Sequence, residues 1–173
     1  SGVTNIKKVV IPGTVEEIGS NAFSNNTTLE EVTIEYGVKR VGQFAFKGCS
    51  NIKSLEFPDS ITEIAYGAML SCSSLTYIKL PNAIKKLNQY VLAGTAITDV
   101  TIPDKVETIS GNSLEACKSL RKIVIPKSVL EIHGGAFWGD KNLSEVVIEE
   151  ENNNFKFENG LLISKDGKIV YWG

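Results

Sequence analysis

Apolar residues return along this chain with a nearly constant period. Units that share one pattern begin 23, 23, 23, 22, 23 and 23 residues apart. A repeat of about 20–50 residues is typical of solenoids, in which each unit forms one turn of a coil. Such a unit is too small to bury its own apolar face, so neighbouring units have to stack. The units begin at Ile6, Leu29, Ile52, Leu75, Ile97, Leu120 and Leu143.

Apolar and polar residues alternate in the first part of each unit. Apolar side chains occupy the fourth and sixth places, as at Val9 and Ile11 or at Leu55 and Phe57. This alternation predicts a strand with one buried face. Proline follows at once in five of the seven units. Because proline lacks an N–H group and fixes φ, it should end the strand at a corner.

Two further apolar pairs complete the unit. The first has two outward residues between its members, as at Val15 and Ile18. The second is a small residue followed by a large apolar one, as at Ala22 and Phe23. We expect this last segment to form a short helical turn whose large side chain fills the interior.

The two outward residues of the second segment change sign from unit to unit. If coils stack in register about 4.8 Å apart, opposite charges become neighbours and stabilise the stack. We therefore assign these charges to stacking and not to the binding of a charged partner. In the first five units the residues are Glu16-Glu17, Lys39-Arg40, Thr62-Glu63, Lys85-Lys86 and Glu107-Thr108.

The complete unit, L-x-x-V/I-x-I/L-P-x-x-V/I-x-x-I-x-x-x-A-F-x-x-C, resembles the BspA-like (Treponema-type) leucine-rich repeats of bacterial surface proteins. The resemblance covers Ile6 to at least Leu143, with departures at Glu35, Met69 and Glu149 and in the 22-residue fourth unit. It implies a leucine-rich-repeat solenoid, a curved right-handed α/β or mostly β coil with a parallel sheet on its concave face. It also implies an extracellular or cell-surface location and a use in adhesion or protein binding.

The pattern changes near the end of the chain. We assign residues 1–148 to six to seven stacked repeats of 22–23 residues, and residues 149–173 to a β-meander that caps them or begins a following segment. Asn159-Gly160 and Asp166-Gly167 are tight-turn signals. They place strands over residues 155–158, 161–164 and 169–172. Because such a cap covers an exposed sheet edge, we expect a monomer.

Composition argues against several classes of partner. The 18 basic and 20 acidic residues are balanced, so no general field attracts nucleic acid or an anionic membrane. No apolar run reaches the ~18 residues of a membrane span, so we expect no membrane insertion. The opening SGVTNIKK lacks the apolar core of a signal peptide. Its Ser1-Gly2 resembles a cloning remnant, and we expect the chain to be a piece of a longer protein.

Three cysteines invite a metal or redox interpretation. Cys49, Cys72 and Cys117 occupy one place in their units, which holds Asn26 and Asp140 in two others. Stacking should align them in a column, in which only Cys49 and Cys72 are near enough for a disulfide. The sequence leaves open whether they are bridged. We interpret all three as small buried side chains, because a zinc site needs four ligands and no histidine accompanies them.

Nothing in the sequence indicates catalysis. His133 is the only histidine, and we expect it at an exposed corner, where it has no second histidine for a metal site. If His133 acted as a general base, its nucleophile would have to be a Ser or Cys residue, and the repeat pattern already explains those residues. There is also no Gly-rich phosphate loop. We therefore predict no catalytic residue, no metal and no cofactor.

Binding should involve apolar or aromatic residues that the pattern points outward. Tyr77, near the middle of the first-strand face, is the best candidate for a partner anchor, with Glu56, Lys79 and Asp99 around it. A tyrosine offers a large contact area with few torsions. The alternative is a lone exposed tyrosine that packs on neighbouring aliphatic stems. Trp138, which we expect to be the most exposed large aromatic within the repeats, is a second candidate.

Three more aromatic residues, Phe44, Tyr66 and Tyr90, precede the small–large pair in consecutive units. They predict an aromatic column on the outer side, unless partial burial between coils explains them.

These observations favour a non-catalytic adhesion or protein-binding module that recognises a host matrix protein, a cell-surface protein or a glycan. The alternative is a spacer, in which the repeats hold another functional domain away from the cell surface. A binding face should expose an apolar patch, whereas a spacer should be evenly polar.

Overall fold

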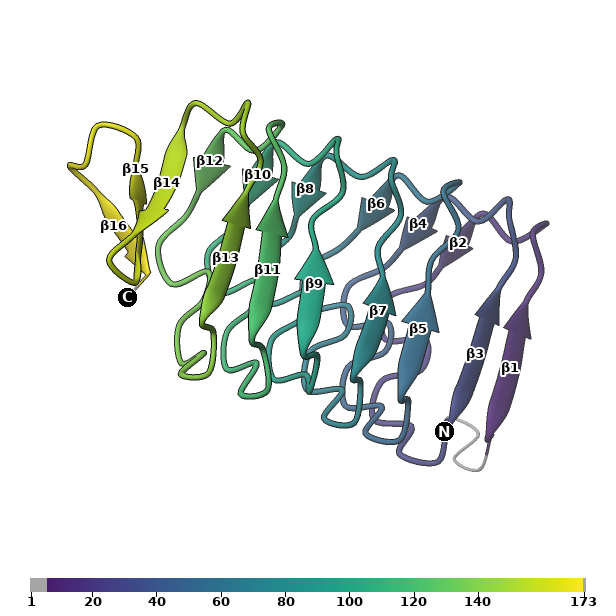
Figure 1. Ribbon diagram of the computed structural model, residues 1–173. Coiled ribbons are helices and arrows are strands. Elements are labelled where there is room, and N and C mark those ends of the chain that lie inside the picture. Colours follow the sequence, from purple (N-terminus) through teal and green to yellow (C-terminus); the bar gives the residue numbers. More distant parts are fainter. Residues whose placement is uncertain (1–5, 173) are drawn as a thin grey trace.

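The chain forms a coil of short strands, seen in a computed structural model that describes residues 6–172. The Ser1-Gly2 pair that we interpreted as a cloning remnant lies outside the described residues. Figure 1 shows two rows of strands facing each other along the coil, with a small separate sheet at the C-terminal end. The predicted solenoid is therefore confirmed.

The first row contains the strands predicted by the alternating segments. They are β1 (Lys8–Ile11), β3 (Glu31–Ile34), β5 (Ser54–Glu56), β7 (Tyr77–Lys79), β9 (Asp99–Thr101), β11 (Lys122–Ile125) and β13 (Glu145–Ile148). The second row comes from the second apolar pair of each unit: β2 (Glu17–Ile18), β4 (Arg40–Val41), β6 (Glu63–Ile64), β8 (Lys86–Leu87), β10 (Thr108–Ile109) and β12 (Glu131–Ile132). The paired strands within these two rows are parallel.

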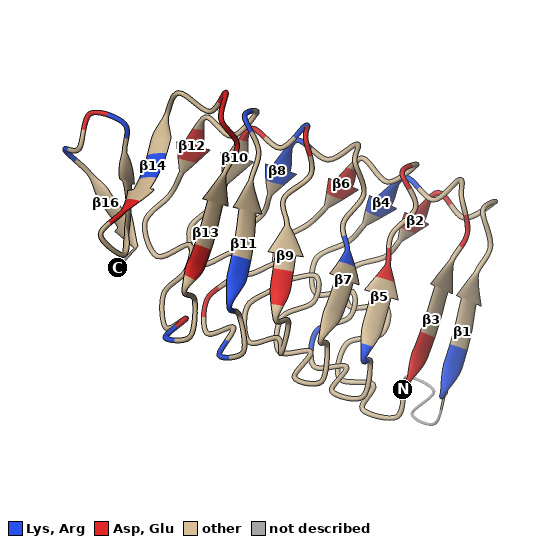
Figure 2. Cartoon of the chain, viewed as in Figure 1, with Lys and Arg blue, Asp and Glu red and all other residues tan. Residues whose placement is uncertain are grey.

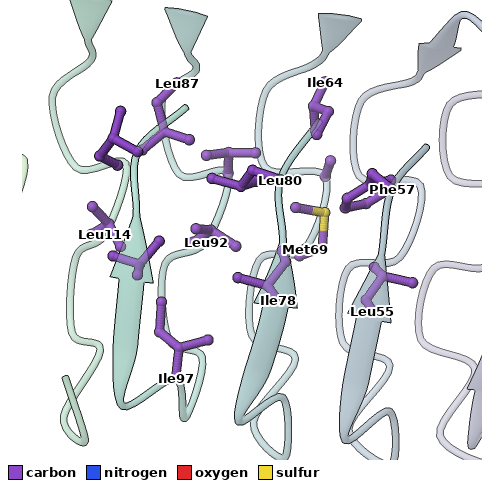
Figure 3. Close-up of a cluster of buried hydrophobic side chains, with 14 of the residues drawn as sticks. Leu55, Phe57, Ile64, Met69, Ile78, Leu80, Leu87, Leu92, Ile97 and Leu114 are labelled. Carbon is purple, nitrogen blue, oxygen red and sulfur yellow. The ribbon is translucent and has the colours of Figure 1, made fainter. Parts of the chain in front are cut away.

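Equivalent places of neighbouring units lie side by side. Val9 pairs with Val32 in the first row, and Val41 pairs with Ile64 in the second. Between the two rows, side chains from both layers fill one interior, as Figure 3 shows for its central part. The residues that open the second to seventh units are buried there, including Leu29, Ile52 and Leu75 at 0–1 % exposure, whereas Ile6 at the first unit is partly buried. The repeated apolar positions thus form one continuous core.

The segment with the small–large pair is not helical, so the predicted helical turn is wrong. Asn21 and Asn25 have φ values of 58° and 59°, which interrupt any right-handed helix. Alternate N–H groups also donate to the next coil and not to their own segment. Phe23 N donates to Ala45 O at 2.8 Å, and Phe46 N donates to Ala68 O at 2.8 Å. The described chain contains no helix, and the mostly β form of the coil is the correct one.

The predicted meander is present at the C-terminal end. Strands β14 (Phe155–Glu158), β15 (Leu161–Ser164) and β16 (Val170–Trp172) form an antiparallel sheet in the order β14-β15-β16. The last strand begins one residue later than predicted. Phe155 and Leu162 of this sheet are buried and belong to the same apolar cluster as the coils.

Charged residues follow the stacking of the coils, as Figure 2 shows. In the second segment, Arg40 forms an ion pair with Glu17, and Lys85 Nζ lies 3.9 Å from Glu107 Oε1. These two contacts agree with the predicted alternation.

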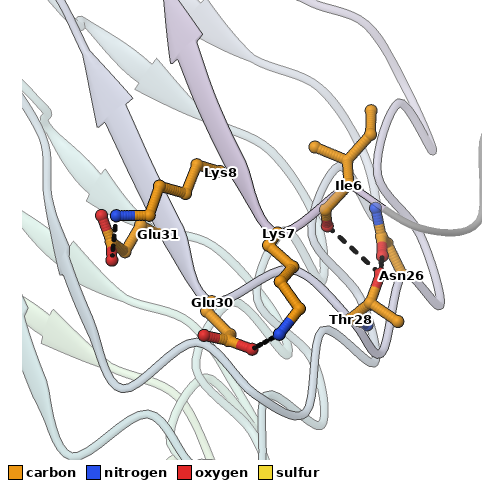
Figure 4. Close-up of polar contacts among 7 residues, drawn as sticks. All are labelled: Ile6, Lys7, Lys8, Asn26, Thr28, Glu30 and Glu31. Carbon is orange, nitrogen blue, oxygen red and sulfur yellow. Dashed lines mark hydrogen bonds and ion pairs between the residues drawn. The ribbon is translucent and has the colours of Figure 1, made fainter.

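The first row adds ion pairs between neighbouring coils that we did not predict. Lys8 Nζ lies 2.8 Å from Glu31 Oε1, and Lys7 Nζ lies 3.2 Å from Glu30 Oε1 (Figure 4). All four side chains are exposed, and exposed ion pairs contribute little to stability. These contacts therefore add only slightly to the stacking of the coils.

The three cysteines are free and buried. Cys49 Sγ donates to Phe23 O at 3.0 Å, Cys72 Sγ to Phe46 O at 3.1 Å, and Cys117 Sγ to Leu92 O at 3.2 Å. Each thiol therefore bonds the backbone of the preceding coil. Burial raises the pKa of Cys49 to about 11 and the pKa values of Cys72 and Cys117 to about 12. These thiols stay protonated at neutral pH, as expected for a structural role.

Asp140 occupies the same place in the next coil. Its side chain is only 1 % exposed, and neither carboxyl oxygen has a hydrogen-bond partner of normal geometry. Burial raises the pKa of Asp140 from 3.8 to about 8, although contact with the Cys117 backbone lowers it in part and nearby Glu115 raises it further. Asp140 is therefore largely a neutral carboxylic acid at pH 7.

The raised pKa of Asp140 predicts a loss of stability as pH rises. Unfolded Asp140 loses its proton near pH 4, whereas folded Asp140 keeps it until about pH 8. The free energy of unfolding should therefore fall across this window, since each pKa unit corresponds to about 1.4 kcal/mol. Asp140→Asn, which copies Asn26 of the same column, should remove this contribution and stabilise the protein by up to a few kcal/mol at pH 8.

Urea unfolding of both proteins at pH 4.5, 6 and 8 measures this difference. Other titrating groups are common to both proteins and cancel in the comparison. Two parallel pH profiles would show that Asp140 is ionised in the folded protein.

The cysteine column predicts protection from thiol reagents. In the native protein at pH 8, Ellman's reagent should label almost none of the three thiols, because they are buried and protonated. All three should react after unfolding in urea. A Ser54→Cys variant supplies the control, since position 54 is exposed on β5. Rapid labelling of the unmodified native protein would contradict the buried column.

Candidate binding surface

The ladder of the first row is interrupted at two places. Hydrogen-bonded pairing joins β1 with β3, β5 with β7, and β9 with β11 and β13, but not β3 with β5 or β7 with β9. At the start of paired strands, an N–H donates to the preceding coil, as from Tyr77 N to Lys53 O at 3.3 Å and from Lys122 N to Thr98 O at 3.3 Å. The described chain contains no equivalent bond to β9. Strands β7 and β9 thus face each other with unpaired edges.

The interruption between β7 and β9 coincides with the 22-residue unit. Only Ala96 separates Thr95 from Ile97, whereas two residues separate Cys49 from Ile52 at the same corner. Ala96 N donates to Leu75 O at 3.0 Å in this shortened turn. The other interruption, before β5, lies in a unit of normal length, so a missing residue is not required to break the ladder.

A groove with a volume of about 610 Å³ lies along the unpaired edges of β7 and β9. We call it the inter-strand groove. It is lined by Thr76, Tyr77, Ile78, Lys79, Leu80, Asn82, Thr98, Asp99, Thr101, Ile102, Pro103 and Asp104.

The inter-strand groove brings together three of the predicted binding residues. Tyr77 is 52 % exposed at its wall. Lys79 lies on the same strand, and Asp99 opens the strand across the groove. Glu56, the fourth predicted residue, pairs in register with Lys79 from β5. The groove therefore combines an aromatic side chain with charges of both signs.

The polar groups of the groove are held in place by neighbours. Asp99 Oδ2 accepts a hydrogen bond of 2.7 Å from Thr98 Oγ1. At the rim, Asn82 donates from its N and Nδ2 atoms to the two carboxylate oxygens of Asp59, at 2.9 and 3.2 Å. The backbone hydrogen bond from Asn82 is the main reason that the pKa of Asp59 is lowered. Neither Lys79 nor Asp99 forms an ion pair within the described chain, which leaves both available to a partner.

Sequence reasoning missed the rest of the lining. Thr101, Pro103 and Asp104 come from β9 and the turn after it, and none of them stands out by residue type. The one available signal was the short fourth unit, which marks the place where regular stacking changes.

Trp138 lies elsewhere, at the end of the coil. It is 66 % exposed and lines a second groove, of about 980 Å³, between the last repeat corner and the C-terminal sheet. We call this the junction groove. It is lined by Ala116, Lys118, Gly135, Phe137, Trp138, Gly139, Asp140, Lys141, Val170, Tyr171 and Trp172.

Trp138 is not the most exposed aromatic residue of the repeats, contrary to our expectation. Tyr36 is 75 % exposed. It follows β3 in a unit where Glu35 replaces the usual proline, a departure that we noted without drawing a consequence for Tyr36.

The predicted column of Phe44, Tyr66 and Tyr90 is confirmed. The Phe44 and Tyr66 rings are 5.2 Å apart edge to face, and the Tyr66 and Tyr90 rings are 5.5 Å apart. Lys47 Nζ also lies 4.9 Å from the centre of the Phe44 ring. The three rings pack on one another from coil to coil, which accounts for them without a partner.

Metal-ligating clusters and His133 were the remaining candidates for a chemical site. Residues 6–172 contain no group of three or more His, Cys, Asp or Glu side chains arranged to hold a metal ion. His133 is exposed, with Nε2 3.3 Å from Glu131 Oε2, at the corner where we expected it. Within the same residues, no helix has the length and apolar character to cross a membrane.

Several solved bacterial proteins share this architecture. A leucine-rich cell surface protein of Faecalibacterium prausnitzii A2-165 superposes with a TM-score of 0.68 and 25 % identity, over 83 % of this chain and 48 % of that one. The leucine-rich repeat protein of T. pallidum gives 0.78 and 29 %, over 83 % and 71 %. A leucine-rich repeat protein of Bacteroides ovatus gives 0.76 and 27 %, over 82 % and 37 %. This chain spans about half the length of the F. prausnitzii protein.

A comparison with curated proteins finds no match. The family model for the BspA type leucine rich repeat region matches in six copies, over residues 1–121 and 40–159. These ranges together cover most of the sequence, and the stacked 23-residue coils supply the structural basis of the match. The chain therefore belongs to the BspA-type leucine-rich repeat family.

Proposed function

We propose that this chain is a non-catalytic module that binds a protein outside a bacterial cell, through the inter-strand groove. The observation that carries the proposal is the gathering of Tyr77, Lys79 and Asp99 at a groove that lies along two unpaired strand edges of the first row. A half-exposed tyrosine beside charges of both signs offers an anchor and polar contacts that fix its orientation.

Unpaired backbone groups strengthen this proposal. An extended partner segment can bond the free N–H and C=O groups of a strand edge while its side chains enter neighbouring hollows. Thr101 of β9 lines the groove and adds a side-chain hydroxyl to these backbone groups. The partner that we propose is a host matrix protein or a surface protein of a neighbouring cell, with a glycan as the alternative ligand.

The family and its structural relatives support a repeat module for protein interaction. The F. prausnitzii relative is described as a cell surface protein, and we propose an extracellular or surface location for this chain as well. The regular ion pairs between coils favour a second function, that of a rigid spacer. We rank binding first because a spacer does not require a groove of this composition.

The proposed site is tested by surface plasmon resonance against a panel of purified extracellular matrix proteins. Tyr77→Ala should weaken binding to the recognised protein by about tenfold or more, as expected for loss of a central aromatic anchor. Tyr36→Ala is the matched control, because Tyr36 is also an exposed tyrosine, just after β3, but lies outside the groove. It should leave binding unchanged.

Thermal unfolding should show that both variants keep the stability of the unmodified protein. Equal binding by the unmodified protein and both variants would show that the partner binds outside the inter-strand groove. Failure to bind any protein of the panel would favour the spacer.

A further inference from the structure

The walls of the junction groove are aromatic, and on one side the rings pack on neighbouring rings. The Tyr171 ring packs edge to face on Phe155 at 5.3 Å, and the Trp172 ring stacks on Phe157 at 6.4 Å. Across from them, Trp138 is two-thirds exposed and has no ring partner within the described chain. An exposed tryptophan beside other aromatic rings offers a large apolar contact area to an inserted apolar side chain.

A free strand edge borders this groove. Strand β16 is the last strand of its sheet, and its Val170, Tyr171 and Trp172 all line the groove. Apart from its ladder with β15, β16 forms no backbone hydrogen bond within the described chain. Such an edge can accept a further strand from another protein.

The rim of the groove is positively charged. Lys118 and Lys141 line it, both are exposed, and neither forms an ion pair within the described chain. Asp140 lies beneath them, but its carboxyl oxygens are covered by protein atoms and largely neutral at pH 7. Glu115 does not line the groove, and its Oε2 accepts a hydrogen bond of 2.8 Å from Asn112. The groove therefore lacks the negative charge that would balance the two lysines.

The lining disfavours a carbohydrate. Carboxylates and side-chain amides are the groups that bond sugar hydroxyls at several fixed points, because each offers more than one hydrogen-bonding atom. Among the lining side chains Asp140 alone is of this kind, and it is covered. An apolar side chain flanked by carboxylates matches the aromatic walls and the basic rim better.

We propose that the junction groove binds an extended acidic segment of a partner protein. The segment pairs with the free edge of β16, places an apolar side chain against Trp138, and sets its carboxylates beside Lys118 and Lys141. This second site lies apart from the inter-strand groove and does not depend on it.

The protein carries its own reporter for this site, because its two tryptophans, Trp138 and Trp172, both line the junction groove. A phage-displayed library of random dodecapeptides is selected on the purified protein, and the enriched peptides are synthesised without tryptophan. We expect these peptides to contain an apolar residue flanked by Asp or Glu. Titration with them should shift the intrinsic tryptophan fluorescence to saturation.

Charge reversal separates this site from general attraction. Lys118→Glu/Lys141→Glu should weaken the peptide by at least about tenfold, since like charges then meet at the rim. Lys53→Glu/Lys105→Glu is the matched control, with the same change of net charge at exposed, unpaired lysines outside the groove. It should bind as the unmodified protein does. Tyr77→Ala should also have no effect, which separates this site from the proposed function.

Three outcomes would overturn the proposal. One is the absence of enriched peptides, or the enrichment of peptides without acidic residues. Another is equal weakening by both charge-reversal variants. The third is saturation of the tryptophan signal by an oligogalacturonate when no selected peptide produces it, which would assign the groove to an acidic carbohydrate.

Discussion

Backbone hydrogen bonds between equivalent residues of adjacent coils are the interaction on which the remaining features of this molecule depend. They align each place of one unit with the same place of the next, so a residue type repeated every 23 positions becomes a column. The coils approach so closely that a Cβ atom on Gly42 would lie 2.6 Å from Ser20 N and 2.8 Å from Gly19 C. Regular stacking therefore constrains the backbone as well as the core.

The column of polar and thiol side chains shows how this constraint acts on one position. Cys49, Cys72 and Cys117 each donate to a carbonyl of the preceding coil, and Thr95 bonds its own coil through Leu92 O at 2.8 Å. A buried place of this kind accepts a small side chain that can donate a hydrogen bond. Asp140 meets that condition only when it is protonated, which links the stability of the last coil to pH.

The two proposed binding surfaces lie where the stacking departs from regularity. The inter-strand groove lies where the ladder between β7 and β9 is missing, next to a turn that is one residue short. The junction groove lies where parallel coils meet an antiparallel sheet. Both departures expose strand edges beside aromatic side chains. In the regular coils, by contrast, charged side chains of neighbouring coils pair with one another.

The 23-residue period of the sequence was sufficient to predict the features that recur in every unit. The first-row strands, the buried unit starts such as Leu29 and the C-terminal meander all follow from spacing and turn residues, whereas the second row was not predicted as strands. The helical turn was wrong because N–H groups such as that of Phe23 bond the next coil, a choice that side-chain pattern does not reveal. The inter-strand groove depends on which strands form a ladder. The neutral state of Asp140 depends on how closely other atoms surround its carboxyl group. Neither the groove nor this protonation state can be predicted from residue types alone.

A double-mutant cycle across one rung tests the stacking most directly. Leu55 and Ile78 are partners in register on β5 and β7, and Ile123 lies on β11, two coils beyond Ile78. In urea unfolding, Leu55→Ala and Ile78→Ala should show a coupling energy of about 0.5–3 kcal/mol, whereas Leu55→Ala and Ile123→Ala should add to within about 0.5 kcal/mol. Additive effects for the partners in register, or equal coupling for both pairs, would contradict a core built from contacts between neighbouring coils.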